Sequence, residues 1–465
     1  MSDASQAQTL AAPLQARFVH GPLRGHVVEM VLTGWASLLA VFAVEFLSLL
    51  YLGTLGEEAI LAAVGLGSMT LFTVMSVSIG VTVGGAAMVS RALGAGDGQG
   101  ARRLGGASLI LMTAATAVAG VLYLAFIGPY AAAVGLEPRV RGHLLSFVFI
   151  STPFMVAGGI GMMLSNLLRA HGRGRQSMWV LLAGTATVAL LDPLVIFVFQ
   201  GGLQGVAWAG AVGRLATMLL GGWLVFGRHR LVRWPTRGEL RPALAAIGRI
   251  AAPAALTGLA TPAAVIFAAS TYAGFGSSVM AGATVMDRVL QLAYSMFFVL
   301  PGAIGPILGQ NLGAGNWDRI RETARLTARL ALAYGLGMAV LLALLAPFIA
   351  DLFKVTGPGR DLVVFFCRYA SFIWVLNSFF FVAVAVFNNL GHAGYSTAIS
   401  WLRATVGTLP LVWLGARLGG PEGVVLGQSA SFALFSLVAL ALCRRVLRRP
   451  PPRPAAAAAG QATGG

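Results

Sequence analysis

Twelve apolar segments, each about as long as a membrane-spanning helix, run along the chain. A helix needs about 20 apolar residues to cross the hydrocarbon core of a bilayer. The segments lie at 30–53, 59–89, 104–127, 142–165, 178–199, 206–226, 251–273, 279–308, 326–347, 361–386, 398–417 and 423–443. Charged residues make up only 10% of the chain, against about 25% in soluble proteins. We therefore predict an all-α polytopic membrane protein with twelve transmembrane helices.

The basic residues of the loops are distributed unevenly between the two sides of the membrane. The net charge of +17 would by itself suggest nucleic acid or anionic lipid as a partner. However, 22 basic residues lie in loops on the side of the termini and 5 lie in the opposite loops. Because basic loops stay in the cytoplasm, we predict a multi-pass protein of a prokaryotic inner membrane with both termini in the cytoplasm. The partner that this charge implies is then the lipid bilayer, and no nucleic acid is expected.

The two halves of the chain repeat each other at an offset of 219 residues. Leu93–Gly96 and Leu312–Gly315 both read LGAG, and Gly172 corresponds to Gly391. Six spans in each half make the two copies parallel, related by an axis along the membrane normal. The repeat therefore predicts two six-helix lobes around a central cavity that holds the substrate site near the midplane.

The predicted domains follow from these spans. They are a cytoplasmic N-terminal tail (1–26), an N-terminal six-helix lobe (27–227), a cytoplasmic linker (228–250), a C-terminal six-helix lobe (251–447) and a disordered cytoplasmic tail (448–465). The Arg-rich linker also fits an amphipathic helix lying on the inner leaflet.

Several motifs, in both lobes, resemble those of the multidrug and toxic compound extrusion (MATE) family. They are SRALGAGDGQGARR after the second span, GQNLGAG after the eighth, LDPLVIF in the fifth span followed by GVAWA, the LRAHG glycine twenty residues before Asp192, and LGTLGEEAILAAVGLG between the first two spans. The LDP feature favours the DinF-like branch of that family. The resemblance implies a secondary transporter with twelve spans in two lobes, and not an enzyme.

Two positions depart from the pattern of that family. The family usually has an aspartate in the first span where this chain has Ser48. Glu45 lies one helical turn earlier on the same face, so it is the candidate for the displaced carboxylate. The asparagines that usually precede the fifth-span aspartate are replaced by Thr185 and Val188.

Three acidic residues lie inside the predicted spans: Glu45, Asp192 and Asp287. An ionised acid at the bilayer centre costs about 2.5–3.5 kcal/mol even on lenient scales, so we expect these residues to bind the coupling cation, H⁺ or Na⁺. Asp192 is the strongest candidate, because Pro193 removes a backbone hydrogen bond and should kink the span there. The alternative for each acid is a structural carboxylate that caps backbone or pairs with an arginine.

Ser48 and Thr185 complete the candidate cation-coupling set. Asp287 adjoins Arg288, and because neighbours on a helix do not face each other, each is expected to find another partner. We assign structural or gating roles to Arg288, Arg214 and Pro193.

Aromatic and polar residues of the second lobe are candidates to line the substrate cavity. They are Gln291, Tyr294, Phe297, Trp374 and Asn377. Such side chains bind flat lipophilic cations by stacking and cation–π attraction. Aromatic residues at helical spacing are also typical of a packed core, and that alternative stays open.

Together these observations predict a multidrug efflux antiporter, which exports small organic, often cationic, compounds in exchange for H⁺ or Na⁺ by alternating access of its lobes. The alternative is a lipid-linked saccharide flippase of a related branch, which would need several arginines in its cavity. No Walker A, HExxH, GxSxG or CxxC motif occurs, so neither ATP-driven pumping nor hydrolysis is indicated. We expect a monomer that carries no cofactor and no metal apart from the coupling ion.

Overall fold

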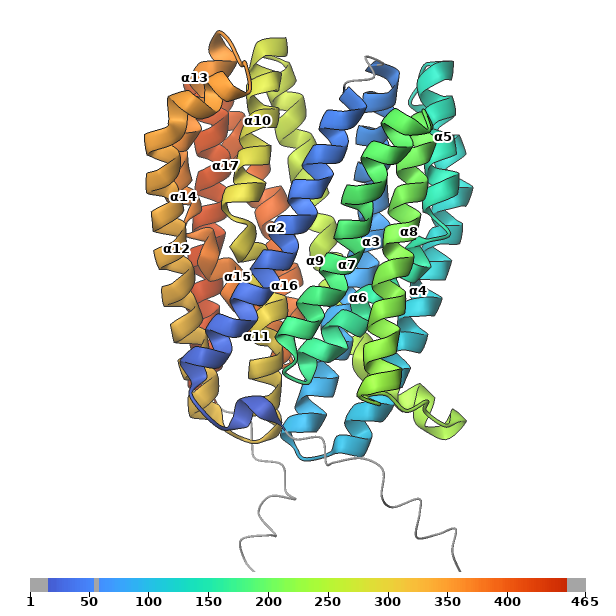
Figure 1. Cartoon of the computed structure of the whole chain (residues 1–465). Coiled ribbons are helices and arrows are strands. Elements are labelled where there is room, and N and C mark those ends of the chain that lie inside the picture. The colour runs from blue at the N-terminus through green and yellow to red at the C-terminus, as the bar shows by residue number, and fades with distance from the viewer. Residues whose placement is uncertain (1–15, 54–57, 450–465) are drawn as a thin grey trace, which may run out of the picture.

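The computed structural model describes residues 16–53 and 58–449, and this part of the chain is helical from end to end apart from short connections (Figure 1). The helices are η1 (Arg17–Val19), α2 (Leu23–Gly53), α3 (Glu58–Gly94), α4 (Gly98–Ala133), α5 (Pro138–Ser151), α6 (Met155–Ala170), α7 (Gly174–Pro193), η2 (Leu194–Val198), α8 (Gly202–Gly222), η3 (Trp223–Arg228), α9 (Arg237–Ala273), α10 (Ser277–Ala293), α11 (Ser295–Gly313), α12 (Trp317–Leu352), α13 (Pro358–Phe365), η4 (Phe366–Ala370), α14 (Ser371–Trp374), α15 (Asn377–Asn389), α16 (Ala393–Leu402), η5 (Arg403–Thr408) and α17 (Leu409–Arg448).

The helices of the described residues account for all twelve predicted spans. Nine stretches are long and apolar enough to cross a membrane, and two further spans are bent helix pairs, α5 with α6 at 49° and α13–α14 with α15 at 41°. The last of the nine stretches is 56 residues long, which is too long for a single span at 1.5 Å per residue. That stretch must therefore contain more than one crossing.

The last stretch is a hairpin of two spans that turns inside α17. Its backbone leaves the helical region at Gly419 and Gly420. A methyl group at Gly415 would lie 2.0 Å from the carbonyl oxygen of Gly423, so the two limbs lie side by side. Glycine at such a crossing lets two helical backbones approach closely. The predicted all-α fold with twelve spans is confirmed.

Two helical bundles stand side by side, with α2 running obliquely between them (Figure 1). The first helix of each half lies at the boundary: α2 packs on both α7 and α11, and α9 packs on both α3 and α16. Gly80 and Gly84 of α3 face Ala251 of α9, where the absence of side chains brings the helices together. The boundary between the lobes therefore includes close helix crossings.

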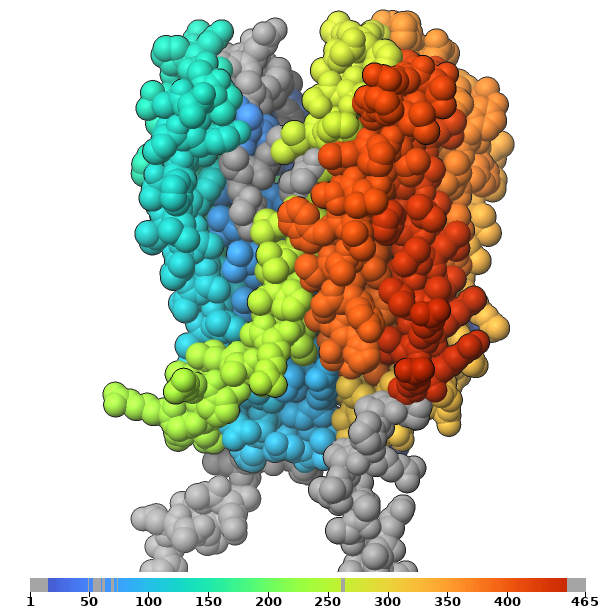
Figure 2. All heavy atoms as spheres, turned by 180° about the vertical axis from the view of Figure 1, so that it is seen from behind, coloured from blue at the N-terminus to red at the C-terminus, as the bar shows by residue number. Residues whose placement is uncertain are grey.

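Both ends of the described chain lie at the same end of the molecule, drawn at the bottom in Figure 1. Figure 2 shows the two halves in contact there and separated from each other at the upper end. The cleft between the lobes therefore opens at the end opposite the described termini.

Part of the predicted linker between the lobes, 228–250, is helical. Helix α9 begins at Arg237, inside the predicted linker 228–250, so no separate amphipathic helix forms. Thr236 and Glu239 form a capping box at its first turn, which explains the early start. The predicted N-terminal tail 1–26 also contains folded residues from Arg17 on, and most of the predicted tail 448–465 lies outside the described residues.

The predicted distortion after Asp192 takes the form of a π-helical turn, η2. The Phe199 N–H donates to the carbonyl oxygen of Leu194 at 3.0 Å, and the Gly201 N–H donates to that of Val195 at 2.8 Å. Pro193 has no N–H to continue the α-helical pattern. The widened turn thus sits directly after the carboxylate of Asp192.

A buried histidine between α6 and α7 makes a specific prediction. Burial, together with the nearby Arg173 and Arg102, lowers the pKa of His171 to about 4. Since an unfolded histidine titrates near 6.5, only the unfolded chain binds a proton as pH falls from about 6.5 towards 4. The free energy of unfolding should then fall by about 2–3 kcal/mol at most.

Thermal unfolding of the purified protein in detergent at pH 7.5 and pH 5 measures this effect. The His171→Gln variant should lose this part of the pH dependence. An equal loss of stability at pH 5 in the variant and the parent protein would contradict the prediction.

Candidate functional site

The buried carboxyl group of Asp192 lies at the C-terminal end of α7, where α7 meets α2. Asp192 is 1% exposed. Its Oδ2 accepts a hydrogen bond from Ser48 Oγ of α2, and its Oδ1 is buried with no hydrogen-bond partner in the described part of the chain. A buried charge without partners is costly. The site therefore suits a carboxyl group that becomes neutral by taking up a proton or a cation.

Thr185 lies two turns before Asp192 on the same helix. Its Oγ1 donates to the carbonyl oxygen of Leu181 at 3.0 Å. That bond uses its hydroxyl within α7, and among the described residues Thr185 makes no hydrogen bond to Asp192. The structure thus brings together two members of the predicted cation-coupling set, Ser48 and Asp192.

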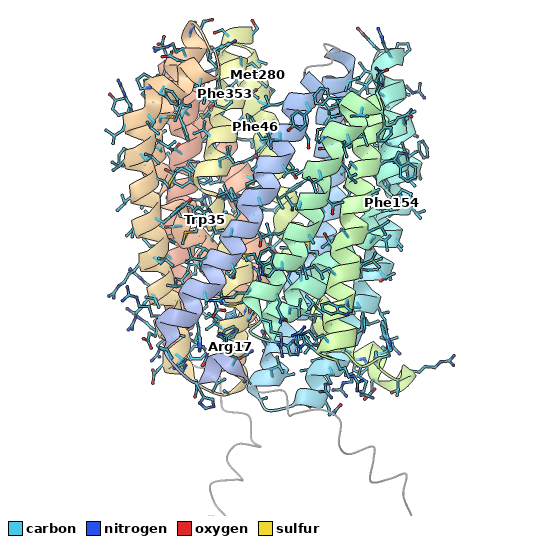
Figure 3. The ribbon with its side chains drawn as sticks, in the orientation of Figure 1. Arg17, Trp35, Phe46, Phe154, Met280 and Phe353 are labelled. Carbon is cyan, nitrogen blue, oxygen red and sulfur yellow. The ribbon has the colours of Figure 1, made fainter. Side chains whose placement is uncertain are left out.

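Glu45 faces the opposite lobe. It lines a small depression with Phe42 and Phe46 of α2 and with Arg288, Gln291 and Leu292 of α10. Arg288 and Arg214 both act on the Glu45 carboxylate electrostatically. Phe46 lies in the upper half of α2 (Figure 3). Its ring packs edge-on against that of Phe353, with the ring centroids 6.2 Å apart. The depression is therefore at the open end of the boundary between the lobes, with one charge of each sign.

Asp287 lines a separate cavity inside the second lobe. The other polar groups of that cavity are Tyr272 of α9, Thr284 of α10 and Gln428 of α17, around a free volume of ≈ 30 Å³. The Tyr272 hydroxyl is buried with no partner in the described residues. This volume has room for a water molecule or an ion, but not for a drug-sized substrate. Asp287 and Arg288 accordingly line different cavities, as their adjacent positions on the helix require.

Most residues predicted to line the substrate cavity lie in the core of the second lobe. Tyr294, Phe297, Trp374 and Asn377 are all buried. The Tyr294 ring packs at a tilt against those of Phe297 and Trp374, with ring centroids 5.3 and 5.5 Å apart, and its hydroxyl donates to the Ser371 carbonyl oxygen at 2.9 Å. In this structure the four side chains therefore pack in the core, the alternative left open above, and their contact with substrate stays a prediction.

Gln291 alone among the five faces the boundary between the lobes. For Phe297, which follows Gln291 in the chain, the reason lies in the break between α10 and α11 at Tyr294, where the backbone leaves the helical region. Because the helix is interrupted there, side chains after the break do not continue the helical spacing that begins at Gln291.

Two arginines lie in the lobes without a carboxylate in contact. Arg214 of α8 packs across Gly158 of α6, and its Nη1 is buried without a hydrogen-bond partner in the described residues. Arg403 lies between the rings of Phe380 and Phe432, 4.6 and 4.4 Å from their centroids. Cation–π contacts of this kind stabilise a desolvated guanidinium. Arg403 therefore has a structural explanation.

Polar contacts close the lobes at the end opposite the Glu45 depression, a feature that the sequence analysis missed. Gln310 Nε2 donates to the carbonyl oxygen of Ala170 at 2.8 Å, and Gln310 Oε1 accepts from the Phe18 N–H at 2.8 Å. The Arg91 guanidinium donates twice to the carbonyl oxygen of Asn389, at 3.1 and 2.6 Å. Each contact joins one lobe, or the segment before it, to the other.

The two copies of the LGAG repeat meet at this closed end. A methyl group at Gly94 would lie 1.9 Å from the Gln310 carbonyl oxygen, and one at Gly313 would lie 2.0 Å from the Arg91 carbonyl oxygen. Arg17, labelled at the lower end in Figure 3, donates to the Gly172 carbonyl oxygen and pairs with Glu29 at 2.9 Å. The LGAG repeat in the sequence is the signal that could have indicated the contact between Gly94 and Gly313 and the opposite lobe.

Among the described residues, no group of three or more histidine, cysteine, aspartate or glutamate side chains could hold a metal ion. The acids of the two lobes are instead dispersed as single carboxyl groups. The arrangement can support proton or monovalent cation binding at separate sites, together with movement of one lobe against the other.

The family model MatE matches residues 35–194 and 253–414, one match in each lobe. The FAD transporter of Shewanella oneidensis is 23% identical over 440 residues, covering 91% of this chain and 95% of that protein. The multidrug export protein MepA of Staphylococcus aureus is 21% identical over 406 residues, covering 85% and 87%. An uncharacterized 21 kDa protein of Pseudomonas savastanoi is 36% identical over 202 residues, and the alignment takes in 43% of this chain and 65% of that protein.

Solved structures share the fold. A mutant of the MATE transporter VcmN of Vibrio cholerae superposes with a TM-score of 0.87 at 22% sequence identity, covering 91% of this chain and 97% of that chain. An identity this low supports the arrangement of the helices and nothing finer.

Proposed function

The chain belongs to the MatE family of membrane transporters, and we propose that it is a multidrug efflux antiporter that exports small organic, often cationic, compounds in exchange for H⁺ or Na⁺. Members of this family are transporters and not enzymes. The proposal of cation antiport rests on one observation above all, the buried carboxyl group of Asp192 with an oxygen that has no partner.

Helix α2 can carry the effect of cation binding from one lobe to the other. Ser48 of α2 donates to Asp192 of the first lobe, and Trp35 of the same helix donates to Ser295 Oγ of the second lobe at 2.9 Å. Cation binding at Asp192 changes the strength of the Ser48 contact. If cation and drug favour different conformations, this difference in affinity couples their movements.

We propose H⁺ as the coupling ion ahead of Na⁺. A carboxyl group with a single hydroxyl donor needs only a proton to become neutral, whereas a sodium ion needs several oxygen ligands around it. In the described residues, Ser48 supplies the one hydrogen bond that Asp192 accepts. Thr185, the other nearby hydroxyl of the predicted set, is bonded within its own helix.

The depression between the lobes supports an organic substrate with an aromatic part. Phe42 and Phe46 supply apolar surface, and Glu45 supplies a negative charge for an organic cation. Arg288 on the facing helix makes a flavin nucleotide the second candidate substrate, since a relative aligned along nearly the whole chain is an FAD transporter. A lipid-linked saccharide flippase is less favoured, because Arg288 is the single arginine among the described residues that line that depression.

The proposed orientation places the described ends of the chain in the cytoplasm, in keeping with the 22 basic residues in the loops on that side. The open cleft then faces outward. We propose a monomer in the inner membrane, because the two lobes of one chain already form the cleft between them. The assignment to the DinF-like branch also stays a prediction.

Transport into proteoliposomes tests the proposal. After the purified protein is reconstituted, an imposed pH gradient should drive ethidium against its own concentration gradient. A sodium gradient at constant pH should not. Gradient-driven movement of FAD in place of ethidium would establish the second substrate class. If neither gradient moves either compound, while the protein remains folded, the antiport proposal fails.

A further inference from the structure

The segment that connects the two lobes projects sideways from the lower end of the molecule (Figures 1 and 2). It runs from η3 through residues 229–236 into the first turn of α9. Three aromatic side chains of this segment are open to the surroundings: Trp223, Phe226 and Trp234 are 56%, 40% and 58% exposed. The transport mechanism makes no use of them.

Exposed arginines lie among these rings. Arg228, Arg230, Arg237 and Arg241 are all exposed, and within the described part of the chain none of them forms an ion pair. We call these four arginines and the three aromatic residues the linker surface. The one acid nearby, Glu239, is already bound by other arginines, Arg233 at 2.8 Å and Arg103 at 3.3 Å. The linker surface therefore carries an uncompensated positive charge.

The linker surface is held in place from beneath. Leu231 is buried in the core of the first lobe, and its N–H donates to the Val225 carbonyl oxygen at 2.9 Å. The Arg233 N–H donates to the Arg102 carbonyl oxygen of α4 at 3.0 Å. Gly106 lets this strand-like segment lie against α4, since a methyl group there would be 2.3 Å from the Arg233 carbonyl oxygen. The backbone that carries the arginines is thus anchored to the first lobe.

One ring–ring contact and one cation–π contact involve the aromatic side chains of the linker surface. Phe226 and Trp234 stack with centroids 6.0 Å apart and planes at 24°. The Arg228 guanidinium lies 6.0 Å from the centroid of the Trp223 ring. These contacts leave the outer faces of the rings open to a ligand that has both charge and apolar surface.

The position of the linker surface along the spans identifies that ligand. Trp223 and Phe226 occupy the last turns of the apolar stretch Gly202–Arg228, and Arg237 begins the next apolar stretch. The surface therefore lies at the boundary between hydrocarbon and water, where tryptophan and arginine are enriched in membrane proteins. Anionic phospholipids present phosphate groups and acyl chains together at this depth.

We propose that the linker surface is a binding site for anionic phospholipid. The four arginines contact the phosphate groups, and the three aromatic rings contact the glycerol region and the upper acyl chains. Charge complementarity argues for an anionic headgroup, and continuity with the apolar belt of the spans argues for a lipid over a soluble anion.

Native mass spectrometry of the delipidated protein with added phosphatidylglycerol tests the site. Arg228, Arg230, Arg237 and Arg241 are changed together to glutamine. The matched control changes Arg444, Arg445, Arg448 and Arg449, four exposed arginines at the same end of the molecule that make no cation–π contact in the described part of the chain. We expect the linker variant to retain phosphatidylglycerol at least about tenfold less well, in line with the attraction of several arginines to anionic headgroups, and the control to bind nearly as the parent does.

Three results would overturn the proposal: unchanged retention in the linker variant, an equal loss in the control variant, or competition by inorganic phosphate as effective as that of the lipid. Trp234→Ser keeps every charge and should weaken retention of phosphatidylglycerol on its own. Trp234 is mostly exposed, so this variant should keep the thermal midpoint of the parent, and full retention of lipid by it would contradict a role for the rings.

Discussion

Asp192→Asn is expected to lower gradient-driven drug transport in proteoliposomes by about 5- to 150-fold, the range of ordinary coupling free energies. Asparagine has the shape of aspartate and can still accept the hydrogen bond that Ser48 donates. It carries no titratable proton, so the cation can no longer change the charge at this position. Ethidium binding measured without a gradient should stay close to that of the parent protein.

Thr187→Val is the matched control for this variant. Thr187 lies on the same helix, and its hydroxyl donates to the Ala183 carbonyl oxygen at 2.8 Å, so it is used within α7. This variant should transport normally. Ser48→Ala should give an intermediate loss, because it removes one hydrogen bond and leaves the carboxyl group. Full gradient-driven transport by Asp192→Asn would exclude Asp192 as the coupling residue.

The second large effect is expected at the closed end, from Gly94→Ala and Gly313→Ala. Each new methyl group would meet a backbone oxygen, at 1.9 Å from Gln310 and at 2.0 Å from Arg91. A backbone atom cannot turn aside as a long side chain can, so the two lobes must separate there. Overpacking of this kind costs about 1–3 kcal/mol, which disfavours the closed state of this end by roughly 5- to 150-fold. Transport should fall in proportion.

Cysteine labelling measures the separation directly. Ser90 is fully buried beside Gly309 at the same interface, so a Ser90→Cys side chain should be protected from a water-soluble maleimide when this end is closed. The native Cys367 and Cys443 are buried in the second lobe and are first replaced by alanine. Labelling should rise when Gly313→Ala is added.

Gly337→Ala provides the control for the glycine variants. A methyl group at Gly337 of α12 would have no atom within 4 Å, so both transport and labelling should match the parent protein. If Gly313→Ala also leaves both unchanged, the closed contact is not a barrier to alternating access.

Patterns that depend on length and composition alone were predicted correctly. The number of spans follows from the apolar runs, since each run must reach across the same thickness of hydrocarbon. The family follows from motifs in a fixed order in both lobes, and the model match to both lobes bears this out. The sequence also singles out Asp192, because a carboxyl group beside a proline inside an apolar run is expensive wherever the neighbouring helices lie; its role in cation coupling stays a prediction.

The sequence is less informative about which way a side chain points. The spacing of Tyr294, Phe297 and Trp374 fits a cavity wall and a packed core equally, and the structure places them in the core. For Phe297 the deciding feature is the break at Tyr294, which turns the chain after α10. Glu45 and Ser48 share a helix face, yet Ser48 contacts Asp192 while Glu45 lies beside Arg288.

The sequence by itself determined the membrane environment, the twelve spans, the pairing of two similar halves and the acids that deserve testing, because these depend on the cost of placing each residue type in hydrocarbon. Only the tertiary structure decided which acids have partners, which end is closed, and that the two LGAG segments meet there. Those facts depend on contacts between helices far apart in the chain, such as Gly94 with Gln310, and no local pattern specifies how one lobe rests against the other.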